Sequence, residues 1–155
     1  MIEFIDKDIF DVHTDGLIHQ CNCFHTMGAG IARTVKELFP EAYRADLATG
    51  YGDSNKLGTF SMATTQNGEY AYISKVINLY GQFRYGRDKR YTDYNALADG
   101  LKLIAVSQQK ERETRLTIPF KMGCNNAGGD WKIVLAIIQS VFEYDKNFRI
   151  LICQQ

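Results

Sequence analysis

The sequence HQCNCFHTMGAGIA, residues 19–32, joins the end of an apolar strand to a glycine-rich turn and the start of a helix. The run 16–21 is typical of a buried strand, and apolar residues recur at helical spacing from about Gly30 to Phe39. A strand that turns into a helix in this way directs several backbone N–H groups at one anion. Gly28 and Gly30 remove the side chains that would block that approach. The sequence therefore predicts a phosphate-bearing ligand at this turn.

The composition is that of a globular protein. Of the 155 residues, 45% are apolar and 23% are charged, so the chain can bury a core, and we expect one domain over residues 1–155. The 18 basic and 18 acidic side chains cancel, which predicts no strong electrostatic footprint for nucleic acid. No apolar run reaches membrane-spanning length, and the N-terminus begins as a strand rather than as a signal peptide.

The cysteines indicate a reduced, intracellular protein. Cys21 and Cys23 are too close for an ordinary disulfide, and their spacing, with no partner pair, is not that of a zinc site. Cys124 and Cys153 lie in or beside apolar runs, as buried thiols do. We therefore expect a cytoplasmic protein without a metal or other cofactor, and a monomer is favoured.

Predicted strands and helices alternate, which favours an α/β fold with a mixed sheet and helices on both faces. The expected strands are residues 2–5, 17–21, 59–65, 70–79, 116–120 and 148–153. The expected helices are residues 30–39, 41–47, 92–106 and 131–144. Asn67-Gly68 predicts a tight hairpin turn, and Thr92 is the expected cap of the third helix.

A second glycine turn, residues 121–130, follows the apolar strand 116–120 and again leads into a helix. The carboxyl ends of parallel strands meet at one edge of a sheet, so the two turns should grip a diphosphate from both sides. Neither turn has the G-x-x-x-x-G-K-[ST] or the G-x-G-x-x-G pattern. The pair therefore does not support a nucleoside triphosphatase or a dinucleotide-binding fold of those types.

Five motifs together resemble the macro domain, a module that binds ADP-ribose. They are H-x-C-N-C at 19–23, M-G-A-G-I-A at 27–32, F-P at 39–40, P-x-x-x-G-C at 119–124 and G-G-D-W at 128–131. The resemblance covers essentially the whole chain. It is strongest to the branch with the yeast ADP-ribose-1''-phosphate phosphatase and the terminal ADP-ribose protein glycohydrolase. It implies a three-layer α/β/α sandwich around a mixed central sheet.

The resemblance also implies which residues hold the ligand. Asp8 would accept a hydrogen bond from the adenine amino group, and the Ile9 N–H would serve a ring nitrogen. Asn22 would lie beside the distal ribose. The loops around the distal ribose and the phosphates would be formed by Met27, Gly28, Ala29, Gly30, Ile31, Gly123, Cys124, Asn125, Asn126, Ala127 and Gly128. The aromatic ring that the family usually offers to the ligand is not identified in this sequence.

The chain departs from the hydrolytic patterns of the family at three places. Ala32 stands where the deacetylase and de-ADP-ribosylase types have an Asp. The lysine and aspartate of the terminal glycohydrolase are also absent, since those regions read Asn78-Leu79-Tyr80-Gly81-Gln82 and Asn126-Ala127. His19, in contrast, matches a histidine of the phosphatase branch. The resemblance therefore argues against a glycohydrolase of these known types.

Three residues are candidates for catalysis: His19, His25 and Asp130. His19, inside an apolar strand, is a core histidine or a catalytic one, and the core role is favoured. His25 is an exposed loop residue or a group that orients water or binds a terminal phosphate, because the ordinary histidine pKa of about 6.5 suits both tasks. Asp130 is a general acid or base, or, preferably, the N-cap of the following helix.

The expected function is binding of ADP-ribose with hydrolysis at the distal ribose, and ADP-ribose-1''-phosphate is the first substrate to test. Loop N–H groups would hold the phosphates and stabilise developing charge, while Asn22 fixes the ribose. His25 or His19 would position water or protonate the leaving group. Two alternatives stay open: a non-catalytic ADP-ribose reader or sponge, and an ADP-ribosyl glycohydrolase acting on modified protein or nucleic acid.

Overall fold

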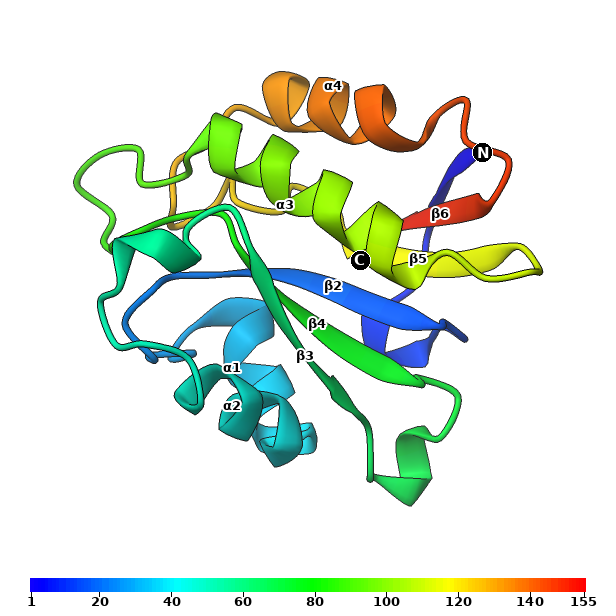
Figure 1. Ribbon diagram of the computed structural model, residues 1–155, viewed down its shortest axis with the longest axis horizontal. Helices are drawn as coiled ribbons and strands as arrows, with labels where there is room; N and C mark the ends of the chain where they lie inside the picture. The colour runs from blue at the N-terminus through cyan, green and yellow to red at the C-terminus, as the bar shows by residue number, and fades with distance from the viewer.

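The computed structural model describes all 155 residues and has one six-stranded sheet at its centre (Figure 1). The strands are β1 (Ile2–Ile5), β2 (Gly16–Cys21), β3 (Phe60–Thr64), β4 (Lys75–Tyr80), β5 (Thr114–Pro119) and β6 (Phe148–Cys153). They lie in the order β1-β6-β5-β2-β4-β3. Only the β3–β4 pair is antiparallel, so the expected mixed sheet is confirmed.

Four helices cover the two faces of the sheet. They are α1 (Gly30–Leu38), α2 (Pro40–Leu47), α3 (Tyr94–Gln108) and α4 (Trp131–Phe142). Figure 1 shows α1 and α2 below the sheet and α3 and α4 above it. This arrangement is the three-layer α/β/α sandwich that the sequence predicts. None of the helices has both the length and the apolar character that a membrane crossing requires.

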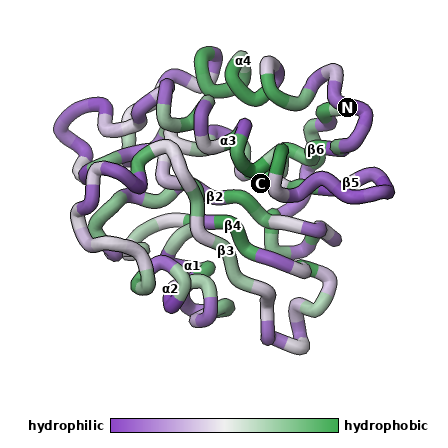
Figure 2. The backbone as a smooth tube through the Cα atoms, in the orientation of Figure 1, coloured by the Kyte–Doolittle hydropathy of each residue, from purple (hydrophilic) through white to green (hydrophobic).

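Two apolar cores, one on each face of the sheet, hold the layers together. Successive side chains of a strand point to opposite faces, so Leu17 and Cys21 of β2 pack toward α1 and α2, whereas Ile18 packs toward α3 and α4. All three side chains are almost fully buried. In Figure 2 the apolar colour runs along β2 and α4, and the hydrophilic colour concentrates in the loops. Burial of both faces of the central strands explains their nearly continuous apolar sequence.

Three short 3-10 helices lie in the connections: η1 (Ile9–Asp11), η2 (Ser54–Lys56) and η3 (Gly68–Tyr70). The third replaces the tight hairpin turn expected at Asn67-Gly68. Asn67 caps η3 by accepting a hydrogen bond from the Glu69 N–H, so β4 begins only at Lys75. The two strands are antiparallel as expected, but a longer connection joins them.

The cap expected at Thr92 was also wrong. Asp93 caps α3 by accepting a hydrogen bond from the Ala96 N–H, and the helix begins at Tyr94. The Thr92 hydroxyl instead donates to the Gly123 carbonyl in the second glycine turn, at 2.6 Å. This contact ties the start of α3 to the edge of the sheet where β1, β2, β5 and β6 end.

Candidate functional site

A cleft of two joined cavities lies at the carboxyl ends of the parallel strands. The main cavity has a volume of about 740 Å³ and the side cavity about 380 Å³. Both volumes are typical of small-molecule sites. The cavities share Gln20, Ala29, Ala32, Gln82, Asn126 and Ala127 in their walls. An extended ligand can therefore reach from one into the other.

The first wall of the main cavity is the N-terminus of α1. Ala29 is its N-cap and provides no side-chain hydrogen bond, whereas α3 and α4 are capped by Asp93 and Asp130. The backbone N–H groups of residues 28–31 donate to no group of the chain. The N-terminus of a helix carries partial positive charge, and free N–H groups there bind anions. The free N–H groups of residues 29–31 in this wall are therefore donors of the kind that bind anions.

The second wall is the turn after β5. The N–H groups of Gly123 and of residues 125–127 also lack a partner within the chain. The turn is held in shape by hydrogen bonds from Gly129 N–H to the Gly123 carbonyl and from Tyr91 N–H to the Ala127 carbonyl, both 2.8 Å. Gly123 has φ +76°, and a Cβ there would lie 2.5 Å from Gln20 Oε1, so this position requires glycine. Two sets of free donors thus line one cavity.

One end of the main cavity is formed by Asp8, Ile9 and Phe10 after β1. Asp8 is exposed and accepts a hydrogen bond from the Phe10 N–H at 2.9 Å through Oδ1. The Ile9 N–H donates to no group of the chain. This end therefore offers a carboxylate oxygen, which is an acceptor, and a free N–H donor from neighbouring residues.

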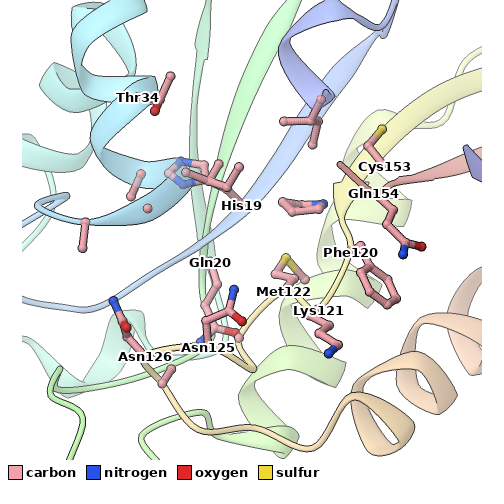
Figure 3. A pocket seen from close by; sticks show the side chains of 18 of the residues that line it. His19, Gln20, Thr34, Phe120, Lys121, Met122, Asn125, Asn126, Cys153 and Gln154 are labelled. Atoms are coloured by element: carbon pink, nitrogen blue, oxygen red, sulfur yellow. The ribbon is translucent and has the colours of Figure 1, made fainter. Parts of the chain in front are cut away.

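Phe120 is an aromatic wall that the sequence analysis did not identify. Its ring lines the main cavity beside Lys121 and Gln154, across from Thr34 of α1 (Figure 3). It packs edge to face against Trp131, with ring centroids 5.1 Å apart. Its position directly after the β5 strand, at the head of a predicted ligand loop, was the available signal.

Asn22 lies in the side cavity, held by its own loop. Its Nδ2 donates to Thr26 Oγ1 at 2.6 Å, and its Oδ1 accepts from the Phe24 N–H at 2.8 Å. One N–H and one lone pair of the amide stay free for a ligand. Met27 and Gly28 line the same cavity.

His19 lines the main cavity but is only 1% exposed. Its Nε2 lies 2.7 Å from Asn78 Oδ1, so its hydrogen-bond partner is a side chain rather than a backbone group. Burial lowers the pKa of His19 to about 4, although the hydrogen bond to Asn78 acts in the opposite direction. The imidazole is therefore neutral at neutral pH.

The other two catalytic candidates lie outside both cavities. The His25 ring contacts Tyr51 edge to face, and its Nε2 lies 3.3 Å from Thr49 Oγ1. Asp130 caps α4 by accepting a hydrogen bond from the Lys132 N–H at 2.9 Å. The capping role favoured for Asp130 is thus the one observed.

Cys124 and Gly128, expected in the phosphate loop, do not line either cavity. Burial raises the pKa of the Cys124 thiol to about 11, which disfavours the reactive thiolate at neutral pH. Gly128, at φ +72°, supports the turn, because a Cβ there would lie 3.2 Å from the Arg90 backbone. Both residues therefore contribute to the shape of the loop rather than to the walls of the cavities.

Comparison by sequence gives a full-length and a partial relative. No family model matches the chain. An uncharacterised 17.5 kDa protein of the tk-vs intergenic region of Enterobacteria phage T4 is 32% identical over 158 residues, which cover 98% of this chain and 95% of that protein. An ADP-ribose 1''-phosphate phosphatase of Ajellomyces capsulatus is 49% identical over 45 residues, which cover 28% of this chain and 18% of that protein.

Comparison by structure finds solved macrodomains with the same fold as this chain. The macrodomain of Thermus aquaticus DarG superposes with a TM-score of 0.78 at 20% identity, covering 100% of this chain and 99% of that one. Thermosipho africanus DarTG in complex with ADP-ribose has a TM-score of 0.78 at 17% identity and covers 99% of this chain but 41% of that one. These matches show that the chain has the macrodomain fold.

Proposed function

Because this chain belongs to the macro domain family, we propose that it binds ADP-ribose in the cleft formed by the main and side cavities. The observation that carries the proposal is the pair of facing walls in the main cavity, each with backbone N–H groups that lack partners. Two adjacent phosphates fit between two such walls. The Thermosipho africanus structure, which is a complex with ADP-ribose, supports the same ligand.

The proposed ligand lies along the cleft in one direction. Its adenine ring is held by the Asp8 carboxylate and the Ile9 N–H, and it stacks on Phe120. Its phosphates lie between residues 28–31 and residues 123–127. Its distal ribose then enters the side cavity beside Asn22.

Calorimetric titration of the protein with ADP-ribose tests this proposal. We expect saturable binding of one ADP-ribose per chain, and competition by ADP, which has the adenosine and both phosphates. Ribose 5-phosphate is the matched control, because it lacks the adenine end and should bind far more weakly. Absence of ADP-ribose binding would contradict the proposal.

For the activity, we propose hydrolysis at the distal ribose, with ADP-ribose-1''-phosphate as the first substrate. Support comes from the partial match to an ADP-ribose 1''-phosphate phosphatase and from His19, the one histidine that lines either cavity. His19 lines the main cavity, two residues before Cys21, which lines the side cavity. Asn78 Nδ2 donates to the Ala42 carbonyl and to Ser61 Oγ, so Asn78 Oδ1 accepts from His19 Nε2–H. The Nδ1 lone pair, 3.8 Å from Cys21 Sγ, is then the basic site proposed for a water proton. A pKa of about 4 makes this a weak base, so we expect slow turnover.

A non-catalytic ADP-ribose reader is the second candidate. It is favoured by the placement of His25 and Asp130 outside both cavities, which leaves the side cavity without either proposed catalytic group. Phosphate release from ADP-ribose-1''-phosphate, followed under single-turnover conditions, separates the two candidates. Release that is lost in His19→Gln supports the phosphatase, whereas binding without release supports the reader.

A further inference from the structure

The connection between β4 and α3, residues 82–92, is called the basic loop here. It carries four basic side chains: Arg84, Arg87, Lys89 and Arg90. Its two ends are joined by an antiparallel bridge between Gln82 and Thr92. The N–H groups of Tyr91 and Thr92 both donate to the Ala127 carbonyl, at 2.8 and 3.1 Å. The basic loop is therefore attached to the second glycine turn.

The basic loop also packs against the first glycine turn. The Cys23 N–H donates to the Phe83 carbonyl at 2.9 Å. The Phe24 ring lies edge to face with the rings of Phe83 and Tyr85, with centroids 5.0 and 6.5 Å apart. Because it contacts both turns, the loop forms a defined part of the side-cavity wall, to which Gln82 and residues 85–87 contribute.

Three of the four basic side chains of the loop lie over aromatic rings. Their cationic groups are 4.4 to 5.3 Å from the ring centres in the pairs Arg84–Phe24, Lys89–Tyr91 and Arg90–Tyr94. Asp88, the one acidic residue of the loop, accepts a hydrogen bond of 2.6 Å from the Tyr91 hydroxyl. Arg87 has no ion pair and lies over no ring. It is thus the one basic side chain of the loop that is free for a ligand.

Arg87 lines the side cavity together with Tyr85 and Gly86. The Tyr85 side chain is 57% exposed, and its hydroxyl is a second polar group in this wall. Gly86 has no side chain, so it is the backbone that lines the cavity there, and its N–H donates to no group of the chain. A Cβ on Gly86 would lie 2.8 Å from Asp88 Oδ1 and from Tyr91 Cε2, so the position requires glycine. Three consecutive residues thus supply hydrogen-bond donors to one wall.

The charges in the side cavity favour an anion at this wall. Arg87 and Asp46 are the only charged residues that line it. Asp46 is 1% exposed and accepts a hydrogen bond of 2.7 Å from the Tyr80 hydroxyl, so its carboxylate is covered, whereas Arg87 is exposed. A guanidinium group binds phosphate through two parallel N–H···O hydrogen bonds. The chemistry of this wall therefore fits a phosphate group.

We propose that Arg87, with Tyr85 and the Gly86 backbone, binds a phosphate group attached to C1'' of the distal ribose. This inference rests on the proposed function, which places the distal ribose in the side cavity beside Asn22. It makes Arg87 the residue that selects 1''-phosphorylated ADP-ribose over ADP-ribose itself. Such a phosphate is either a terminal monoester or a phosphodiester that joins the distal ribose to a nucleic acid, and the wall recognises the group that the two share.

The test is calorimetric titration with ADP-ribose and with its 1''-methylenephosphonate, an analogue of the 1''-phosphate whose C–P bond is not hydrolysed. We expect wild type to bind the phosphonate roughly 10-fold more tightly than ADP-ribose. Arg87→Gln should lose this preference, while its affinity for ADP-ribose changes less than about twofold. Arg87→Lys keeps the charge without the planar fork and should retain part of the preference.

Arg84→Gln is the matched control. It removes the same charge from the same loop, but Arg84 lines neither cavity. We expect this variant to keep the full preference for the phosphonate. A loss as large as that in Arg87→Gln would mean that only the overall charge of the loop matters, and it would overturn the assignment to Arg87.

The monomethyl ester of the phosphonate distinguishes the two sources of the phosphate. It carries one negative charge, as a phosphodiester does, whereas a phosphate monoester carries about 1.5 to 2 at pH 7. A preference for the ester that Arg87→Gln abolishes supports the inference with a phosphodiester as ligand. An Arg87-dependent preference that is confined to the free phosphonate supports it with a terminal phosphate as ligand.

The remaining outcomes separate this inference from the proposed function. Wild type that binds neither ADP-ribose nor the phosphonate overturns both. Wild type that binds ADP-ribose but shows no preference for the phosphonate or its ester overturns the inference alone, even if the variants fail to fold. An equal loss of affinity for ADP-ribose and the phosphonate in Arg87→Gln also overturns it, because a merely structural role has no preference for the phosphorylated ligand.

Discussion

Gly30, at the N-terminus of α1, lines the main cavity without a side chain. Its φ is +57°, and no atom lies within 4 Å of the position that a Cβ would take, so a side chain there would project into open space at the main cavity. We expect Gly30→Glu to weaken ADP-ribose binding at least 100-fold, since it places a carboxylate where a phosphate should bind. Because the backbone is left-handed at this position, the substitution should also lower the free energy of unfolding by about 1 kcal/mol.

Calorimetric titration of Gly30→Glu with ADP-ribose, compared with the same titration of Gly68→Glu, measures this effect. Gly68 is also open around its Cβ position but lies in η3, outside both cavities. Gly68→Glu should bind like wild type. Unchanged affinity in Gly30→Glu would mean that the ligand lies elsewhere.

His19 makes the stability of the protein depend on pH. Its pKa is lowered to about 4 by burial, whereas an unfolded chain binds the proton near 6.5. Between these values the unfolded state holds more protons, so the contribution of His19 is fully present above pH 6.5 and is lost as pH falls toward 4. We expect the free energy of unfolding to fall by up to about 1.4 kcal/mol per pH unit in this window.

Urea unfolding at several pH values checks this dependence. His19→Gln, which has no titrating group, should flatten the curve between pH 6.5 and 4. Asp15 should dominate only below its ordinary pKa, because the Arg112 guanidinium, 2.7 Å away, holds the pKa of that carboxyl far below its usual range. An equally steep curve in His19→Gln would assign the effect to another group.

At the scale of elements, the N-terminus of α4 has a structural task. Asp130 accepts a hydrogen bond from the Lys132 N–H and lines neither cavity. We expect Asp130→Ala to lower the free energy of unfolding by about 1 kcal/mol, while Asp130→Ser, which keeps a capping oxygen, restores most of it. ADP-ribose affinity and any phosphate release should be unchanged in both variants. Loss of turnover in the well-folded Asp130→Ser variant would instead make Asp130 an acid or base.

The elements that could be predicted were those specified by local pattern. The two glycine turns each follow an apolar strand and precede an amphipathic helix, and both were found where expected. The turn at Asn67-Gly68 could not be predicted in detail, because Asn67 also contacts the Leu38 carbonyl, 29 residues away, at 3.0 Å. A contact of this range outweighs a two-residue turn preference.

The parts of the site that sequence reasoning missed depend on tertiary neighbours. Asp46 lies on α2, whose sequence predicts only a helix. It borders the side cavity and accepts a hydrogen bond from Tyr80 on β4. Gln20 also depends on contacts that are distant in sequence, since its hydrogen-bond partners Gln82 and Thr92 are 62 and 72 residues away. The place of Phe120 in the cavity wall could be recognised only once the ends of β1, β5 and β6 were known to meet in one cavity.

At the scale of the whole molecule, the main cavity joins four segments that are distant in sequence. They are residues 8–10, 29–34, 119–127 and 153–155, and they come from the ends of β1, β2, β5 and β6. Each segment alone has backbone groups open to solvent. A ligand bound between the segments contacts all four at the same time. Binding should therefore suppress local opening in all of them together.

Hydrogen exchange with and without ADP-ribose tests this coupling. We expect slower exchange in all four segments, most strongly for the free N–H groups of residues 29–31, Gly123 and residues 125–127, because these become donors to the phosphates. The connection 65–74 and residues 109–113 line neither cavity and should not change, so they serve as internal controls. ADP should protect the same four segments but leave Asn22 and Thr26 unprotected, since it has no group for the side cavity. Protection limited to one glycine turn would show that the two walls do not grip the same ligand.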